Sequence, residues 1–429
     1  MVDLEVIYKE VDDLSHEKVM EIMRNLIKID TSVPPGNTYR EYLDVISPYF
    51  EKLGFELEEV LVPKDIVDKW DVSLIGPRVN LVASKNYGQD EDITFYGHID
   101  VVPAPSGGLK EWSFPPFQAT MIKSGKIYGR GTADMKGSMA SLILALQIIK
   151  KLNLVPKYNL TILNCTDEEI SPYPGVAYLA EKGYVKGTVF CLDGDIKSNI
   201  TIGSFGFLNI IVDTYGKSCH SAVNFMGVNA LEQTIPILTE LMKLKEIVEE
   251  RESDTIPGIP RPGSNRKWNF SPMFNLNIMK VGTTDSIVPD HCMLLINRRI
   301  IPKENHDDVK REIEEAIERG RVKSKLLDVK TTFDFSFPAM KADPNSKGIL
   351  RIKKAMALVN KISEDTIKPI GMFGSTDMSF LNRMLNIEDI IVHGVCYGGS
   401  NEHGVNEHIR MKDLITFIKE LIVFLCHDF

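Results

Sequence analysis

The sequence is poor in the features that mark cross-linked, exported or membrane-embedded proteins. Its 429 residues contain only six cysteines, spread singly along the chain with no Cys-x-x-Cys pair. Neither a thiolate zinc site nor a disulfide scaffold is therefore indicated. No apolar run approaches the roughly 20 residues that a membrane helix needs, and the first 18 residues lack the basic start and apolar stretch of a secretory signal. We expect a protein of the reducing cytoplasm without membrane association.

A basic surface is also missing. Because the formal net charge is −9, no stripe of Lys and Arg is expected to neutralise phosphates, which argues against nucleic acid as a partner. The hydrophobic share of 43% and the charged share of 25% are those of an ordinary globular protein. A chain of 429 residues exceeds the usual size of one hydrophobic core. We therefore expect two domains and a small-molecule substrate.

The first half of the chain mixes helical and strand-like segments. Short runs rich in β-branched and aromatic residues predict strands, and apolar residues at helical spacing predict helices. Together they predict an α/β sheet with helices packed on its faces. The predicted strands are Asn80–Ala83, Ile93–Tyr96, Leu160–Leu163 and Thr188–Leu192, and the predicted helices are Asn37–Leu53 and Met135–Lys151.

The pattern changes after Gly206. Residues 207–337 read in the order β-α-β-β-α-β, which is that of a ferredoxin-like α+β domain, with the Pro- and Gly-rich stretch Ser253–Pro272 as a loop inside it. From residue 348 the α/β character returns, with a helix over 349–361, a strand over 390–395 and a closing helix over 412–426. We predict a three-layer α/β/α domain, residues 1–206 and 338–429, into which residues 207–337 are inserted.

Polar residues end the predicted strand that contains Ile93–Tyr96. His98 and Asp100 stand two positions apart, so that period two places both on one face of the strand. A carboxylate beside an imidazole can fix its tautomer and leave the other ring nitrogen free for a metal. The alternative is a surface turn in which His98 and Asp100 only bond each other.

A glycine-rich bend, Gly129–Gly137, leads into the predicted helix and carries Asp134. Asp134 is either an ordinary N-capping residue or, because such a bend brings backbone close to something, a carboxylate that bridges two cations. Its glycine spacing does not fit a phosphate-binding loop.

Further acids and histidines follow other strands. The run Thr166–Glu169 is either a solvated acidic loop or part of a site at the carboxyl ends of strands. Asp193 and Asp195 follow another strand, and the segment Ser400–His408 offers two histidines. His, Asp and Glu converging from several strand ends form the ligand set that zinc prefers.

Together these motifs resemble the family of aminoacylases, acetylornithine deacetylases, succinyl-diaminopimelate desuccinylases and glutamate carboxypeptidases, which are dinuclear metal amidohydrolases. The resemblance runs from His98 to His403. It implies two divalent ions, zinc or alternatively cobalt, with Glu168 as the general base and Asp100 orienting His98. The ligands it implies are His98 and Asp193 for one ion, Glu169 and His403 for the other, and Asp134 as the bridge.

Within the insertion, the resemblance implies a lid and dimerisation domain. Its His220, in Gly216–Ala222, is similar to a family histidine that completes the site of a partner subunit, and we expect it to stabilise the developing oxyanion. Arg299, which aligns better than Arg298, is similar to a substrate-binding arginine. Beyond the insertion, the segment Gly374–Asp377 resembles a substrate loop of the family, with Gly374 and Thr376 as binding residues. We expect a homodimer.

Several choices stay open in the sequence. Many family members have Glu-Pro where this chain has Asp193-Gly194-Asp195, so Asp195 rivals Asp193 as a ligand. His408 rivals His403, although the Asn406-Glu407 pair after His403 favours the latter. The predicted reaction is hydrolysis of the amide bond of an N-acyl amino acid. The alternatives are a dipeptidase or carboxypeptidase with the same metals and a non-catalytic binding member.

Overall fold

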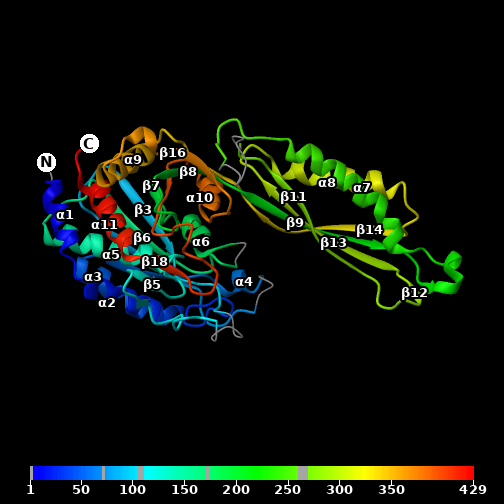
Figure 1. Cartoon of the computed structure of the whole chain (residues 1–429), viewed down its shortest axis with the longest axis horizontal. Coiled ribbons are helices and arrows are strands. Elements are labelled where there is room, and N and C mark those ends of the chain that lie inside the picture. The colour runs from blue at the N-terminus through cyan, green and yellow to red at the C-terminus, as the bar shows by residue number, and fades with distance from the viewer. Residues whose placement is uncertain (1–2, 70–72, 105–110, 171–172, 259–268) are drawn as a thin grey trace. The chain divides into compact units, whose positions relative to one another are not determined.

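The computed structural model describes residues 3–69, 73–104, 111–170, 173–258 and 269–429. Contacts along the chain divide it into two compact units. The first comprises Met1–Thr201, Ala342–Pro369 and Met384–Phe429, and the second comprises Ile202–Lys341 and Ile370–Arg383. The predicted insertion, residues 207–337, lies within the second unit (Figure 1).

The first unit is built on a six-stranded mixed sheet. The strands follow the order β1 (Glu56–Leu61), β2 (Val79–Lys85), β6 (Asn159–Cys165), β3 (Asp92–His98), β7 (Thr188–Cys191) and β17 (Ile390–Val392). The four strands from β6 to β17 run parallel, whereas β1 and β2 run antiparallel to their neighbours. The carboxyl ends of β6, β3, β7 and β17 therefore meet at one edge of the sheet, where α/β folds place their chemistry.

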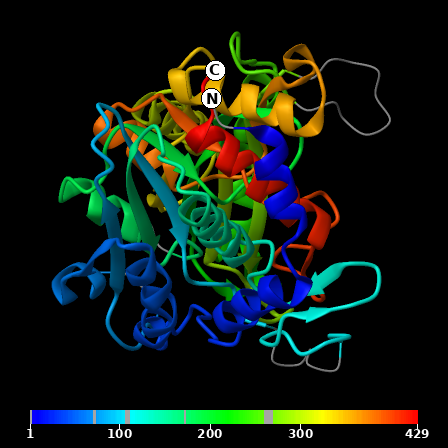
Figure 2. The same cartoon turned by 90° about the vertical axis from the view of Figure 1, so that its left-hand side faces the viewer.

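Helices enclose this sheet. Almost every residue of β3 and all those of β7 and β17 are buried, which requires that both faces be covered. The three-layer α/β/α prediction is confirmed, and Figure 2 shows helices around the strands. The helices are α1 (Leu4–Asp12), α2 (His16–Ile27), α3 (Tyr39–Leu53), α4 (Lys64–Val67), α5 (Lys136–Lys151), α6 (Gly175–Glu181), α9 (Lys347–Asn360) and α11 (Met411–Cys426), with the 3-10 turn η2 (Glu364–Thr366).

A second, small sheet in the same unit joins distant segments of the chain. It consists of β4 (Thr120–Met121), β5 (Lys126–Tyr128) and β18 (His408–Arg410), in the order β18-β5-β4. Strand β18 pairs antiparallel with β5, so that His408 lies opposite Tyr128. This pairing brings the segment that carries His403 beside the bend that carries Asp134.

The second unit contains the predicted ferredoxin-like fold. Its antiparallel sheet has the order β11 (Met273–Val281), β13 (His291–Ile300), β9 (Gly206–Tyr215) and β14 (Asp328–Phe337). Helices α7 (Ala230–Glu249) and α8 (His306–Arg321) pack on each other and enclose a core that includes Ile210, Leu241 and Ile296. Its smaller elements are β10 (Cys219–His220), η1 (Ser221–Met226), β12 (Ile287–Val288) and β15 (Met340–Lys341). Strands β8 (Asn199–Ser204) and β16 (Lys368–Met372) and helix α10 (Met378–Leu385) cross the boundary between units.

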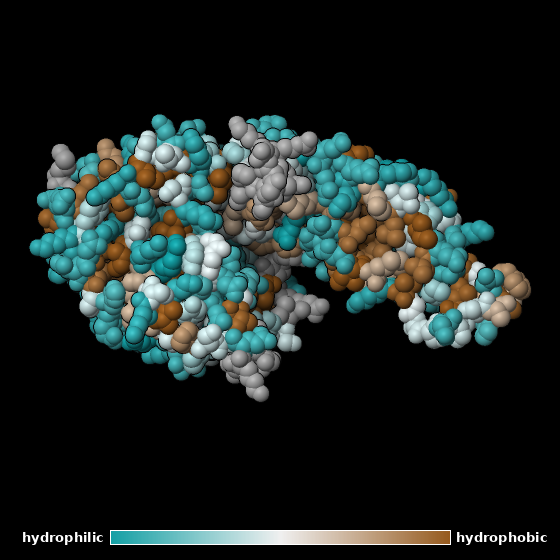
Figure 3. Space-filling model, in the orientation of Figure 1, coloured by the Kyte–Doolittle hydropathy of each residue, from teal (hydrophilic) through white to brown (hydrophobic). Residues whose placement is uncertain are grey.

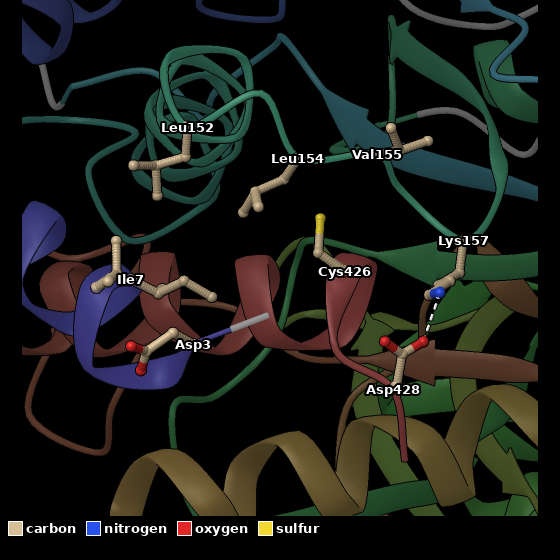
Figure 4. Close-up of a pocket in the computed structure, with 9 residues that line it drawn as sticks. Asp3, Ile7, Leu152, Leu154, Val155, Lys157, Cys426 and Asp428 are labelled. Atoms are coloured by element: carbon tan, nitrogen blue, oxygen red, sulfur yellow. Dashed lines mark ion pairs between the residues drawn. The ribbon is translucent and has the colours of Figure 1, made fainter. Parts of the chain in front are cut away.

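The two ends of the described chain lie side by side in the first unit. Helix α1 contacts α11, and a surface cavity of about 350 Å³ is lined by residues of both ends together with Leu152, Leu154 and Val155 (Figure 4). An ion pair of 2.5 Å between Lys157 Nζ and Asp428 Oδ1 closes one side of this cavity. No helix among the described residues is long and apolar enough to span a membrane.

The elements differ from the sequence prediction mainly at their ends. The strand predicted over 390–395 ends at Val392, because His393 turns into the core, where its Nε2 lies 2.7 Å from Glu420 Oε2. Helix α8 begins at His306, directly after the capping side chain of Asn305. Part of the predicted loop Ser253–Pro272 lies outside the described residues.

Candidate metal centre

The candidate ligands come from separate elements of the first unit. His98 is the last residue of β3, Glu169 lies in the turn after β6, and Asp193 follows β7 by two positions. Asp134 precedes α5, and His403 lies in the loop before β18. The parallel arrangement of β6, β3 and β7 gathers the first three at one edge of the sheet.

Two groups of side chains in the described part of the chain could each hold a metal ion. One consists of His98, Asp134 and Asp193, and the other of Asp134, Glu169 and His403. In each group the ligand atoms all lie within 4.8 Å of one another. Imidazole nitrogen and carboxylate oxygen are donors suited to borderline cations such as zinc.

Asp134 belongs to both groups and turns one oxygen to each histidine. Its Oδ1 lies 2.9 Å from His98 Nε2, and its Oδ2 lies 2.8 Å from His403 Nε2. Asp134 does not cap α5, which starts at Lys136 and has no capping side chain. The donor set and its arrangement fit two cations that share one carboxylate.

Asp100 supports this edge of the centre through its backbone as well as its side chain. His98 Nδ1 lies 3.1 Å from the Asp100 carbonyl oxygen, and it must carry the hydrogen because a carbonyl only accepts. The Nε2 of His98 is then the nitrogen available to a cation. Asp100 Oδ2 accepts from the backbone N–H of Glu169 at 3.0 Å. Both His98 and Asp100 are buried, unlike residues of a surface turn.

The two rival ligands have other partners. Asp195 is partly exposed and pairs with Lys197, with 2.8 Å between Asp195 Oδ2 and Lys197 Nζ. His408 Nδ1 lies 2.9 Å from the Asn406 carbonyl oxygen, and its Nε2 lies 2.7 Å from the Tyr397 hydroxyl. Neither Asp195 nor His408 belongs to the two groups of candidate ligands.

The first two residues of the run after β6, Thr166 and Asp167, are buried rather than solvated. Asp167 is fully buried with a φ of 63°, a left-handed conformation that a non-glycine residue adopts at a cost of about 1–2 kcal/mol. Its Oδ1 accepts from the Tyr39 hydroxyl at 2.9 Å and lies 3.3 Å from Arg78 Nε. Burial and then the charge of Asp100 raise the pKa of Asp167 to about 6. This network fixes the turn that presents Glu168, which is partly buried, and Glu169.

Hydrogen bonds to carboxylates raise the pKa of both candidate histidine ligands. Hydrogen bonds to Asp134 and then Glu169 raise the pKa of His403 to about 10. Burial would lower the pKa of His98, but its bonds with Asp100 and Asp134 outweigh burial and raise it well above the usual range. Burial and then the charge of Asp134 raise the pKa of Glu169 to about 7. Because these hydrogen bonds to carboxylates favour the protonated form of both imidazoles, metal binding has to compete with protons for their ring nitrogens.

Two buried residues beside the candidate ligands, Arg130 and Glu407, were not identified as functional from the sequence. Glu407 is fully buried and accepts from the Arg130 guanidinium at 2.7 Å and from backbone N–H groups of the bend before Asp134. His403, four residues earlier, has a φ of 59°. The only signal in the sequence was the position of Arg130 and Glu407 inside the two motifs.

The other predicted site residues lie in the second unit. His220 ends β10 and is exposed, and its Nδ1 accepts from the Ala222 backbone N–H at 3.1 Å. Arg299 on β13 lies with its guanidinium carbon 5.0 Å from the centre of the Phe207 ring. Gly374 and Thr376 follow β16, and Thr376 is buried.

At the edge of the mixed sheet, carboxylates and imidazoles form two groups of candidate metal ligands. Such groups can hold the ions of a metal-dependent hydrolase. The sequence matches the model of peptidase family M20/M25/M40 over residues 94–425. The chain belongs to this family of dinuclear metallopeptidases and amidohydrolases, and it is a metal-dependent hydrolase.

Relatives and solved structures match nearly the whole chain. A probable succinyl-diaminopimelate desuccinylase of Staphylococcus epidermidis is 28% identical over 94% of this chain and 96% of its own length. An N-formyl-4-amino-5-aminomethyl-2-methylpyrimidine deformylase of Halalkalibacterium halodurans is 25% identical over 97% and 96%. The structure of human carnosine dipeptidase 1 shares the fold, with a TM-score of 0.73 and 18% identity over 99% of this chain and 98% of that chain.

Proposed function

We propose that the protein hydrolyses the amide bond of an N-acyl amino acid. The observation that carries this proposal is the position of Asp134 between two groups of ligands, with one carboxylate oxygen 2.9 Å from the His98 imidazole and the other 2.8 Å from that of His403. The names of the two relatives, a desuccinylase and a deformylase, favour removal of an acyl group over cleavage of a peptide.

The proposed cofactors are two zinc ions, with cobalt as the alternative. His98 and Asp193 would hold one ion, Glu169 and His403 the other, and Asp134 both. When bound, such a pair lowers the pKa of a water molecule and polarises the scissile carbonyl. His403 is more than half exposed, with a side-chain exposure of 56%, whereas Glu169 is at 3%. A substrate would therefore approach from the side of His403.

Glu168 is the proposed general base. It lies beside Glu169 in the turn after β6 but belongs to neither ligand group. A carboxylate that is not bound to metal can accept a proton from the attacking water and deliver it to the leaving nitrogen. Asp100 would position two partners, holding the His98 ring with its carbonyl and the Glu169 backbone with its carboxylate.

Arg299 is the proposed anchor for the carboxylate of the substrate, together with Gly374 and Thr376. The neighbouring Arg298 is buried and committed to Glu304, with 2.5 Å between Arg298 Nη2 and Glu304 Oε1. Arg299 is only half-buried and stacks on Phe207. An arginine suits this task because its planar fork matches a carboxylate.

A panel of substrates tests the proposed reaction. We expect N-succinyl and N-acetyl amino acids to be hydrolysed with higher kcat/KM than dipeptides and C-terminally extended peptides by the zinc- or cobalt-loaded protein. Higher kcat/KM for dipeptides would instead identify a peptidase, the second candidate function, which rests on the likeness to dipeptidase structures. Metal-loaded protein that cleaves neither class would favour a non-catalytic binding member.

We further propose a homodimer formed through the second unit. Strand β11 stands at the end of the sheet order and exposes residues on both faces over Leu276–Lys280. Figure 3 shows apolar side chains gathered where Figure 1 draws β9, β11 and β13. Helix α7, which contacts β11, exposes Leu231, Ile235 and Met242. An apolar edge strand is a template for pairing with another chain, and a second copy would pair with it symmetrically.

His220 is proposed to complete the centre of the partner subunit. Because its Nδ1 accepts from Ala222, its Nε2 carries the hydrogen in the neutral ring and can donate to a developing oxyanion. His220→Ala should lower kcat by about 10²–10³-fold without changing metal content. Subunits of this variant, exchanged with subunits of Glu168→Gln, should regain activity near half the wild-type rate per mixed dimer.

The mixed dimer would carry one centre with both residues intact. Demonstrated exchange, followed by labelled subunits, without any recovery of rate would mean that His220 does not act across subunits. We also propose that the protein is cytoplasmic, because its six cysteines are scattered singly along the chain without a Cys-x-x-Cys pair, a pattern typical of a reducing compartment.

A further inference from the structure

Glu407 is a buried carboxylate that contacts the metal centre without belonging to either ligand group. Its Oε2 accepts from Arg130 Nη1 at 2.7 Å and from the Gly131 N–H at 3.0 Å. Its Oε1 accepts from the N–H groups of Ala133 at 2.8 Å and Asp134 at 3.3 Å. One side chain thus accepts from three backbone N–H groups of the bend that presents Asp134.

The same residues also hold the loop that presents His403. Arg130 Nη2 donates to the His403 carbonyl at 3.2 Å, and the Gly129 N–H donates to the Glu407 carbonyl at 3.0 Å. Arg130 is buried and lies over the Trp112 ring, with 5.4 Å from its guanidinium carbon to the ring centre. The Arg130–Glu407 pair therefore bonds to the backbone of both loops, at Asp134 and at His403.

The bend and the loop that this pair joins are distant in sequence, and the backbone of the loop is strained at His403. The bond from Arg130 to His403 spans 273 residues. His403 has a φ angle of 59°, a left-handed conformation that non-glycine residues seldom adopt. Conformations of this kind persist only where the surroundings fix them. A charge-assisted bond between a fork-shaped guanidinium and a carboxylate is suited to that task.

We propose that Glu407 and Arg130 form a clamp that sets the distance between the ligands Asp134 and His403 and thereby the affinity for the metal pair. This role rests on the proposed function, because it takes Asp134 and His403 as ligands. Glu407 and Arg130 are positioning residues that act through the backbone. Their loss should weaken the ion of the Asp134–Glu169–His403 group more than the ion of the His98–Asp134–Asp193 group.

Glu407→Gln tests the clamp directly. The amide keeps the size of the side chain but replaces one acceptor oxygen by a donor, which must face either Arg130 or the backbone N–H groups. Partners that orient ligands typically contribute about 10–100-fold to metal affinity. We expect stepwise titration with Co²⁺ to show a loss of this size for one of the two ions, together with a changed visible absorption spectrum of the bound cobalt.

Glu304→Gln is the matched control. It removes a carboxylate from another buried arginine pair, Arg298–Glu304, in the second unit, so it carries a similar folding penalty but should leave cobalt affinity and spectrum unchanged. If Glu407→Gln does not fold, Arg130→Lys supplies the test, because lysine retains the charge but cannot bond Glu407 and the His403 carbonyl together. It should weaken the same ion.

Three results would overturn the clamp. Wild-type affinity and spectrum in folded Glu407→Gln, or in Arg130→Lys where only that variant folds, would exclude it while leaving the proposed function intact. An equal loss of affinity in Glu304→Gln would assign the effect to general destabilisation. Wild-type protein that binds no pair of ions would overturn the ligand assignment, and both the proposed function and the clamp with it.

Discussion

Glu168→Gln is expected to lose nearly all turnover while it retains both metal ions. The amide can still hydrogen-bond a water molecule but cannot accept its proton, and general bases contribute about 10²–10⁴-fold to rate. Because Glu168 belongs to neither ligand group, its replacement should not alter metal stoichiometry. Metal content by atomic absorption and kcat on an N-acyl amino acid would be measured on the same preparation.

Glu169→Gln provides the comparison for this variant. The two glutamates are adjacent in one turn, yet Glu169 Oε2 lies 3.1 Å from His403 Nε2 and belongs to a ligand group. Its replacement should remove one ion along with activity. If Glu168→Gln kept more than about a tenth of the wild-type kcat, less than the smallest loss expected for a general base, another residue would have to take the proton.

The main elements of the fold could be read from the sequence because each has a local cause. Strand β3 is a buried run of apolar and aromatic residues, and α5 has the composition of a buried helix. The order of the elements in residues 207–337 then implied the ferredoxin-like topology, which is confirmed. Their exact ends depended on single side chains, such as the Asn305 cap of α8, that periodicity does not resolve.

The candidate ligands were harder to establish from the sequence, because each motif had an ordinary alternative. Burial excludes two of these alternatives. Thr166 and Asp167 are buried and so do not form a solvated loop, and the buried His98 does not lie in a surface turn. The choice between Asp193 and Asp195 could not be made by spacing. The choice depends on which side chains each aspartate contacts in the fold. Asp195 forms an ion pair with Lys197, whereas Asp193 lies beside His98 and Asp134.

The supporting network could not be predicted because its contacts are long-range. Asp167 bonds Tyr39, which is 128 residues away, and Glu407 bonds Arg130, which is 277 residues away. Nothing in the local pattern around Arg78 or Tyr39 points to a buried acid after β6. Such pairs become visible only when the sheet has brought the turns at its edge together.

Asp134→Ala is expected to lose metal and activity together. Two divalent ions held in one centre would repel each other strongly, and the Asp134 carboxylate would supply negative charge to both. Its removal also takes the acceptor oxygens from both His98 and His403. The first ion should bind more weakly and the second should not bind at micromolar concentrations, which calorimetric titration of the metal-free variant would show.

The local backbone should survive this change, because the N–H groups of residues 133 and 134 still donate to Glu407. Loss of metal could then be assigned to the carboxylate rather than to unfolding, and circular dichroism would check this. Asp195→Ala is the control, since Asp195 is a partly exposed acid of the neighbouring loop that pairs with Lys197. It should keep both ions and most of the activity. Full metal occupancy in Asp134→Ala would end the assignment of Asp134 as the bridge, and loss of an ion in Asp195→Ala would return Asp195 to the ligand set.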